Sequence, residues 1–545
     1  MTHLLLSRRA GAVEVVELSG ADEPVATSTV SHDDLPGWVR GRETAHPRWT
    51  WDDTARWYPA LLRAGVRVQR CWDLRLGHDL LRRSPLTRSV APHPGSARWD
   101  ALGPATDVGD TLFDGDGVDG SLAVVAEHRW QRAALAGCPE PGRLALLATA
   151  ESSAALVATE MTHAGLPWDA AVHRELLLQL FGPRPLTGQR PAVLERLVAE
   201  VREAFAAPSL NPDSPGPLLQ ALRAAGLTVD DTRTWTLERL QHPGLPALLE
   251  YKRLARLLST NGWAWLDTWV HDDRFRPEYL PGGVVTGRWA SRGGGALTVP
   301  APLRPAVRSD PGWQLVVADA AQLEPRVLAG LGGDLTMAGA GRGTDLYEGM
   351  VATGAVATRS EAKLGMLGAM YGGTSGESGR MVTRMTRRYP AAFGYVEEAA
   401  RAGERGEVVR TLLGRGSPAP SGAWTLAATE LPREAGTHDR DRRSWGRFTR
   451  NFVVQGTAAE WALCWLALLR NKLWQLAPDG LLTERPHLVM FLHDEVLVHC
   501  PEPLVTEVEL AVRDAAAEAG RLLFGSFPVD FPLQVSVVSS WAQAR

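Results

Sequence analysis

The chain has 545 residues, of which 45% are hydrophobic, and a formal net charge of -4. This length predicts several domains with a large core, and the small net charge does not by itself indicate a nucleic-acid-binding protein. The four cysteines are scattered without CxxC pairs, which argues against structural zinc and for a reducing compartment. Without a signal peptide or an apolar run of spanning length, we expect a soluble, cytoplasmic, bacterial protein with no membrane contact.

The first 150 residues predict a mixed α/β region. The segment LLLSRRAGAVEVVELS (4–19) suggests two strands. Three acidic residues, Asp114, Asp116 and Asp119, could suggest a calcium loop. They lack the EF-hand spacing and its final Glu, so a flexible acidic loop is the better interpretation.

Helices rich in Leu, Arg and Ala are expected from about residue 185 to 275, followed by a strand and a helix that carry carboxylates. Gln314 to Ala318 predicts a buried strand that ends at Asp319. Gln322 to Leu331 then has helical spacing, and Pro325 is tolerable in a first helical turn. Asp319 is therefore expected at the end of a strand.

The segment TRSEAKLGMLGAMYGG (358–373) predicts a helix with Arg359, Lys363, Leu367 and Tyr371 on one slowly turning face. Two cations one turn apart suit a triphosphate, although an ordinary amphipathic helix with a basic edge explains the same pattern. The chain has 58 Lys plus Arg but only three lysines, so Lys363 stands out against its background. A compact ammonium can titrate where a guanidinium does not.

The segment HLVMFLHDEVLVHC (487–500) predicts two short buried strands joined by a turn that holds His493, Asp494 and Glu495. If an antiparallel sheet brings Asp494 beside Asp319, the carboxylates form a site for two divalent cations, the arrangement required for in-line phosphoryl transfer. A solvated hairpin turn, where Asp is common, is the alternative interpretation of this stretch alone.

Three spaced motifs carry a resemblance to a known family. Asp319-Ala-Ala-Gln-Leu-Glu324-Pro-Arg326, then Arg359 to Gly372, then His493-Asp494-Glu495 resemble motifs A, B and C of family A DNA polymerases, the DNA polymerase I group. The segments TGRWAS (286–291), LLEYKRLARLLST (248–260) and RFTRNFVVQGTAAEWA (447–462) extend the likeness from about residue 160 to the C-terminus. Three motifs in order are far more specific than a lone loop.

The resemblance implies a role for each matching residue. Asp319 and Asp494 would bind two Mg²⁺ ions, with Mn²⁺ as a substitute, and Glu495 would support them. Glu324 would be a steric gate against a ribose 2′-hydroxyl, and Lys363 a candidate proton donor to the departing pyrophosphate. The nucleotide-binding set would be Arg359, Lys363, Leu367, Tyr371, Glu324 and Gln322, and the DNA-binding set Arg288, Arg447, Asn451, Gln455 and His493.

Several positions depart from the family pattern. Ala320 and Ala321 replace the usual Tyr and Ser after the motif A aspartate, and Leu367 replaces an aromatic residue. The pair Leu297-Thr298 replaces a Gln-Asn pair that serves the primer terminus. None of these side chains is needed for metal-assisted transfer, so we expect catalysis to survive and discrimination to weaken.

The family places an RNase H-like 3′-5′ exonuclease domain where residues 1 to 150 lie. Such a domain needs an Asp-x-Glu on a strand and two further carboxylates for its own metal pair, and no Asp-x-Glu is found here. We therefore expect a degenerate, inactive domain. Nothing resembling a 5′-nuclease domain precedes it in this sequence.

The predicted fold class is α/β multidomain, a right-hand polymerase preceded by an RNase H-like domain. Its parts would be an exonuclease-like domain (1–150), connecting helices and thumb (151–275), palm (276–335 and 455–545) and fingers (336–454). The predicted function is template-directed DNA synthesis in repair or gap filling by a monomer at the nucleoid, with primer-template DNA and dNTPs as partners. A polymerase with an unrecognised active exonuclease site and a catalytically dead DNA-binding scaffold are the alternatives.

Overall fold

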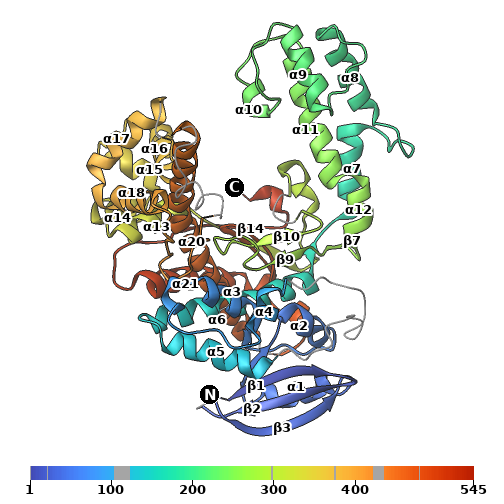
Figure 1. Cartoon of the computed structure of the whole chain (residues 1–545). Helices are drawn as coiled ribbons and strands as arrows, with labels where there is room; N and C mark the ends of the chain where they lie inside the picture. Colours follow the sequence, from blue (N-terminus) through green and yellow to red (C-terminus); the bar gives the residue numbers. More distant parts are fainter. Residues whose placement is uncertain are drawn as a thin grey trace. The chain divides into compact units, whose positions relative to one another are not determined.

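The computed structural model describes residues 2–20, 22–103, 123–295, 299–373, 376–420, 435–477 and 479–544. The chain divides into two compact units (Figure 1). Unit 1 comprises Met1–Ala164, Tyr279–Ser291 and Gly312–Val537, and unit 2 comprises Gly165–Glu278, Arg292–Pro311 and Val538–Arg545. The acidic loop around Asp114 and the pair Leu297-Thr298 lie outside the described residues.

Unit 1 begins with a five-stranded sheet of order β3-β2-β1-β4-β5. The predicted strands are present as β1 (His3–Arg9) and β2 (Ala12–Leu18), which pair antiparallel across a two-residue turn containing Gly11 at φ +75°. β3 (Pro24–Ser31) pairs antiparallel with β2, whereas β4 (Arg48–Trp51) and β5 (Cys71–Asp73) run parallel to β1. The RNase H-like assignment of this region stays a prediction.

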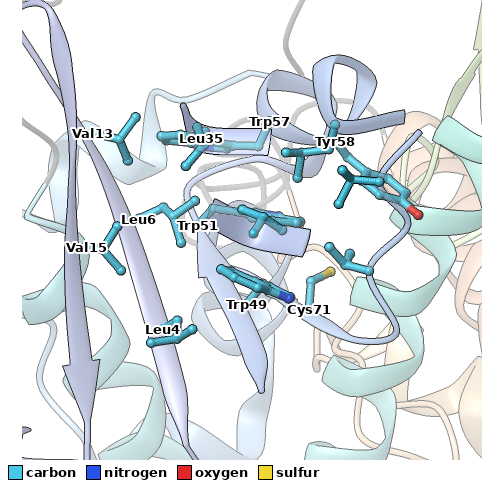
Figure 2. Close-up of a cluster of buried hydrophobic side chains, with 14 of the residues drawn as sticks. Leu4, Leu6, Val13, Val15, Leu35, Trp49, Trp51, Trp57, Tyr58 and Cys71 are labelled. Carbon is cyan, nitrogen blue, oxygen red and sulfur yellow. The ribbon is translucent and has the colours of Figure 1, made fainter. Parts of the chain in front are cut away.

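Helices cover this sheet and close an aromatic core. They are α1 (Leu35–Glu43), α2 (Thr54–Arg63), α3 (Leu74–Arg83), α4 (Ser96–Asp100), α5 (Val124–Ala136) and α6 (Pro141–Ala164). Figure 2 shows Trp49 and Trp51 of β4 packed with Leu6 of β1, Val15 of β2 and Trp57 of α2. Large rings that bury 150 Å² or more each make this small sheet a stable platform.

A buried ion cluster joins this region to the rest of unit 1. Arg470 lies on the long helix α20 (Ala435–Leu476), and its guanidinium donates to both carboxylate oxygens of Glu160 on α6, at 2.8 and 2.6 Å. It also donates to the Val68 and Gln69 carbonyls, while the Tyr58 hydroxyl donates to Glu160 at 2.6 Å. Burial alone would raise the pKa of Glu160, but Arg470 and Arg67 hold it below its usual value.

The second sheet of unit 1 has the order β12-β13-β11-β14. β11 (Trp313–Ala320), β12 (His487–Leu492) and β13 (Glu495–Pro501) are the strands predicted from aliphatic runs, and β14 (Leu533–Val538) completes the sheet. Leu492 pairs with Glu495, so the turn between β12 and β13 contains only His493 and Asp494. Glu495, expected in the turn, is instead the first residue of β13.

A group of helices follows β11 and packs against α20. Its members are α13 (Leu323–Gly332), α14 (Leu335–Gly341), α15 (Leu346–Ala352), α16 (Arg359–Tyr371), α17 (Gly376–Arg388) and α18 (Pro390–Glu404). Figure 1 shows them gathered beside α20, and α21 (Val505–Phe524) packs along α20 as well. α20 runs without a break through residue 455, the predicted start of the second palm segment, and the five-part division of the chain stays a prediction.

Unit 2 is mainly helical. Its helices are α7 (Ala170–Phe181), α8 (Ala192–Ala204), α9 (Pro215–Ala224), α10 (Thr234–Leu237), α11 (Leu245–Asn261) and α12 (Trp263–Trp269). Leucine-rich faces of α8 and α11 build two apolar clusters, one toward α7 and one toward α9. A small sheet of order β6-β8-β7 contains β6 (Leu166–Pro167), β7 (Val270–His271) and β8 (Arg274–Phe275). Two more short strands, β9 (Glu278–Leu280) and β10 (Ala290–Arg292), pair with each other and belong mostly to unit 1.

Two helices of the described residues are long and apolar enough to cross a membrane by length and composition, Pro141–Ala164 and Arg440–Leu476. The sequence-based expectation had not recognised either as an apolar run of that length. In the most apolar stretch of each, 72% and 83% of the residues are buried inside the protein. Burial of this extent is typical of core helices, so their composition is weak evidence for a membrane span.

The Arg470 cluster makes a stability prediction. Arg470→Met should lower the free energy of unfolding by about 3–5 kcal/mol, because Glu160 would remain buried without its main cation. Lys472→Met on the same helix removes a partly exposed pair with Glu518 (3.3 Å) and should cost less than about 1 kcal/mol. Urea unfolding followed by tryptophan fluorescence measures both, and equal costs would contradict a dominant role for the buried pair.

Candidate active site

Three acidic residues, Asp319, Asp494 and Glu495, lie at one end of the four-stranded sheet. β11 and β13 pair antiparallel with Asp319 opposite Glu495, and the Ala320 amide donates to the Asp494 carbonyl at 2.9 Å. His493 has φ +60°, a left-handed conformation that closes the two-residue turn and fixes Asp494 beside the end of β11. The predicted meeting of these carboxylates across an antiparallel sheet is therefore present in the structure.

Burial and mutual repulsion disfavour ionisation of this pair. Burial, and after it the negative charge of Asp319, raise the pKa of Asp494 to about 7. Burial also raises the pKa of Asp319. Two half-buried carboxylates of like charge resist carrying their full charge unless a cation is added.

The donor set fits Mg²⁺ held jointly by protein and substrate. Among the described residues no group of three or more His, Cys, Asp or Glu side chains could hold a metal alone. Mg²⁺ is commonly bound through one or two carboxylates together with substrate phosphates and water, whereas an all-protein cage would need more ligands. Asp319 and Asp494 suit that mode.

A hydrogen-bonded group around Glu324 lies next to these carboxylates. Gln322 lies between β11 and α13 and adopts a left-handed conformation (φ +51°) at the N-cap of α13. Glu324 lies in the first turn of α13. Glu324 forms an ion pair with Arg288 and accepts a hydrogen bond from the Tyr371 hydroxyl at 3.1 Å. Gln455 of α20 donates to the same hydroxyl at 3.3 Å. Four residues predicted separately as nucleotide or DNA ligands are thus directly connected.

Local packing holds Arg288 and His493 near this group. Trp289, next to Arg288, is buried, and its ring lies edge-on to Phe491 of β12 with centroids 5.0 Å apart. Burial, followed by the positive charge of Arg288, lowers the pKa of His493. A neutral imidazole can both donate and accept a hydrogen bond. Burial, and then the charge of Glu324, raise the pKa of Tyr371, which keeps its hydroxyl a donor.

Helix α16 presents its predicted face to solvent. It runs from Arg359 to Tyr371, with Thr358 as N-cap accepting a hydrogen bond from the Glu361 amide at 3.2 Å. Arg359, Lys363, Leu367 and Tyr371 are all exposed on this face, whereas Ala362, Met366 and Ala369 are buried. The predicted helix is therefore present, and the face that the four residues share is its exposed side.

Two residues that the sequence did not single out, Asp345 and Tyr347, complete the surroundings of Arg359. Asp345 caps α15 and accepts hydrogen bonds from Arg359 (2.9 Å) and Gln322 (3.0 Å). The Arg359 guanidinium lies 5.4 Å from the centroid of the Tyr347 ring. Both residues lie on a short helix, where no periodic pattern or spaced motif marks them.

The other predicted DNA-binding residues lie along α20. Arg447 is exposed, and its aliphatic stem packs so closely on Gly372 that a side chain there would collide with it. Asn451 is half-buried, and its Oδ1 accepts no hydrogen bond from the described residues. With Gln455 they follow one face of the helix at intervals of four residues.

The carboxylates of the N-terminal sheet are engaged by protein donors. Asp73 accepts hydrogen bonds from the Thr54 and Leu76 amides, at 2.7 and 3.0 Å. Asp53 caps α2 and pairs with Arg75 at 2.8 Å, and Asp52 pairs with Arg56 at 3.3 Å. Strand β1 (HLLLSRR) carries no carboxylate. These acids serve as caps and ion pairs.

A family model described as DNA polymerase family A matches residues 192–543, which include every predicted site residue. This chain belongs to that family. A relative is the thermostable DNA polymerase I of Thermus filiformis, 28% identical over 350 residues that cover 58% of this chain and 38% of the relative. DNA polymerase I of Chloroflexus aurantiacus is 26% identical over 330 residues, covering 56% and 33%. The chain thus spans under two fifths of these relatives' length.

A solved structure shows that the fold is shared. The POL domain of Pol1 from M. smegmatis, in complex with DNA primer-template and dNTP, matches with a TM-score of 0.69 and 18% identity over 100% of this chain and 95% of that domain. The fold class is therefore the predicted one, an α/β right-hand polymerase.

Proposed function

We propose that this chain is a template-directed DNA polymerase that adds deoxynucleoside monophosphates to a primer 3′-hydroxyl and releases pyrophosphate. The observation that carries the proposal is the register of β11 and β13, which sets Asp319 opposite Glu495 and beside Asp494. Family membership supports it, because the matched region contains these motifs. Repair synthesis or gap filling is the proposed setting, with Mg²⁺ as the cofactor.

The carboxylates would hold two divalent cations. When bound there, such ions activate the attacking hydroxyl and stabilise the leaving oxygens. Asp319 and Asp494 supply the ligands, and Glu495 borders them from the first position of β13.

The cations of α16 would hold the triphosphate. Arg359 is half-exposed and forms an ion pair with Asp345 at 2.9 Å. A bound triphosphate would replace the Asp345 carboxylate as the anion paired with Arg359. An exposed ion pair contributes at most about 1 kcal/mol, while a guanidinium can bind phosphate through two parallel hydrogen bonds. Lys363 is exposed one turn further and could donate a proton to the departing pyrophosphate.

Glu324 would exclude a ribose 2′-hydroxyl. Arg288 and Tyr371 hold its carboxylate from two sides, so its position near the nucleotide sugar would be rigid. Arg288, Gln455, Asn451, Arg447 and His493 would bind the primer-template. Leu367, where the family has an aromatic ring, offers no ring to stack on the nucleotide sugar, which favours low fidelity.

The N-terminal domain would lack exonuclease activity, because the carboxylates described there are held as caps and ion pairs and β1 carries none. An active exonuclease is the first alternative. A DNA-binding scaffold without catalysis is the second alternative. Two half-buried aspartates with raised pKa values argue against it, since a scaffold gains nothing from them.

Loss of either aspartate should abolish synthesis. Asp319→Asn or Asp494→Asn removes a metal ligand and should slow primer extension by at least about a hundredfold, with little change in primer-template affinity. Asp514→Asn, on the exposed side of α21, is the matched control and should extend normally. Near wild-type extension by either site variant would refute the two-metal assignment.

Removal of the Glu324 side chain should relax sugar selection. Glu324→Ala should raise kcat/KM for ribonucleotides relative to deoxynucleotides by about tenfold or more, because the bulk beside the 2′-position is lost. Glu324→Gln keeps that bulk and is the control. Unchanged selectivity in Glu324→Ala would place sugar discrimination at another residue.

Incubation with a mispaired primer terminus tests the N-terminal domain. With Mg²⁺ or Mn²⁺ and no dNTPs, the full chain should leave the primer uncut, since no second metal pair is expected. Metal-dependent shortening that persists in Asp319→Asn would restore the proofreading alternative.

A further inference from the structure

Arg415 is a buried cation that the candidate site described above does not include. It lies in a hairpin formed by residues 409–417, in which the Thr411 amide donates to the Arg415 carbonyl at 3.0 Å. Its side chain is 12% exposed and forms an ion pair with Glu151 of α6, which is 2% exposed. Arg415 Nε and Glu151 Oε2 have no hydrogen-bond partner among the described residues. A buried ion pair with such unpartnered atoms adds little to stability, which points to a role beyond folding.

The backbone of this hairpin is held from two sides. The Leu413 amide donates to the Glu460 carboxylate of α20 at 3.0 Å. From the N-terminal region, the Ser84 hydroxyl donates to the Gly414 carbonyl at 2.7 Å. Because these neighbouring backbone groups are fixed, the arginine side chain starts from a fixed point, and its ion pair sets where the guanidinium lies.

The guanidinium of Arg415 lies against Gly287, the residue immediately before Arg288. Gly287 has φ +84° and closes a tight turn: its amide donates to the Val284 carbonyl at 2.8 Å, and the Val284 amide donates to the Arg288 carbonyl at 3.1 Å. A side chain at position 287 would collide with the Arg415 guanidinium. The turn therefore rests on Arg415 at the one residue that leaves room for so close an approach.

Arg288 connects this turn to the candidate active site. It forms an ion pair with Glu324, whose carboxylate also accepts a hydrogen bond from the Tyr371 hydroxyl at 3.1 Å. Displacement of the turn would therefore move a partner of the carboxylate that is proposed to exclude a ribose 2′-hydroxyl. A misplacement of about 1 Å at a positioning group can change a rate by roughly a hundredfold.

We propose that Arg415 is a positioning residue for Arg288, and through it for Glu324, an inference that rests on the proposed polymerase function. Glu151 holds Arg415 from α6, so the N-terminal region contributes to the choice between deoxyribonucleotides and ribonucleotides. Neither Glu151 nor Arg415 contacts the nucleotide in this role, so their effect lies in selectivity and not in the loss of a ligand.

Single-nucleotide incorporation, measured well below the temperature of thermal unfolding, tests the proposal. Arg415→Gln should lower the ratio of kcat/KM for a dNTP to that for the matching rNTP by roughly three- to thirtyfold, because the turn under Arg288 loses its support. Arg415→Lys keeps the charge opposite Glu151 and should restore part of the ratio. Glu151→Gln changes the size of the acid little and should lower the ratio as well, so it carries the same test should Arg415→Gln not fold.

Arg410→Gln is the matched control. Arg410 lies in the same hairpin and pairs at 2.7 Å with Glu140, which immediately precedes α6, so this change also removes one ion pair between the hairpin and the N-terminal region. Its nucleotide selectivity should equal that of the wild type. A double-mutant cycle isolates the path through Arg288: in an Arg288→Ala background, Arg415→Gln should change the ratio by less than about twofold.

Hydrogen exchange of the free chain gives a readout without catalysis. Peptides that cover residues 282–291 should exchange faster in Arg415→Gln than in the wild type, and Arg410→Gln should leave them unchanged. Unchanged selectivity in Arg415→Gln, an equal loss in Arg410→Gln or full additivity with Arg288→Ala would overturn the proposal. A wild-type chain that extends no primer would instead refute the polymerase function, and exchange in the turn would still decide whether Arg415 holds it.

Discussion

The pairing of β11 with β13 is the constraint on which the candidate active site depends. Side chains alternate between sheet faces, so a slip of one residue would turn Asp319 away from Glu495. The register is held by aliphatic residues buried along both strands and by the Ala320 amide bonded to the Asp494 carbonyl. Apolar packing thus brings two acidic groups together, and the raised pKa values of Asp319 and Asp494 are the consequence.

In the proposed function, bound ligands would exchange with the internal partners of the charges around this pair. Arg359 is held by Asp345 and Arg288 by Glu324, so neither cation is unpaired before substrate binds. Gln322 links the end of β11 to the Arg359–Asp345 ion pair, because it lies just after that strand and donates a hydrogen bond to Asp345. A phosphate that displaces Asp345 from Arg359 of α16 would therefore also alter the hydrogen bond of Gln322 at the start of α13.

The sequence predicted those parts of the site that depend on local pattern. Aliphatic runs gave β11, β12 and β13, and four-residue spacing gave α16 with its exposed face. Asp345 escaped notice because its contacts with Arg359 and Gln322 bridge 14 and 23 residues, across which no periodicity operates. The position of Glu495 was predicted wrongly because the same sequence is compatible with a two-residue turn and with a three-residue turn. Only the pairing of Leu492 with Glu495 shows which turn forms. Composition likewise gave no sign that Arg470 and Glu160 would be buried together.

The buried ion cluster links the N-terminal region to the candidate active site. Arg470 and Gln455 belong to one unbroken helix, α20, and 15 residues of helix separate them by about 22 Å. A helix transmits position along its axis, so anchoring Arg470 on Glu160 and on the Val68 and Gln69 carbonyls also limits how far Gln455 can move from Tyr371. In the N-terminal region, Asp53 and Asp73 cap helices, and Asp52 and Asp53 pair with arginines. Metal binding by these acids would require their withdrawal from these partners, which supports the proposal that the N-terminal region lacks exonuclease activity.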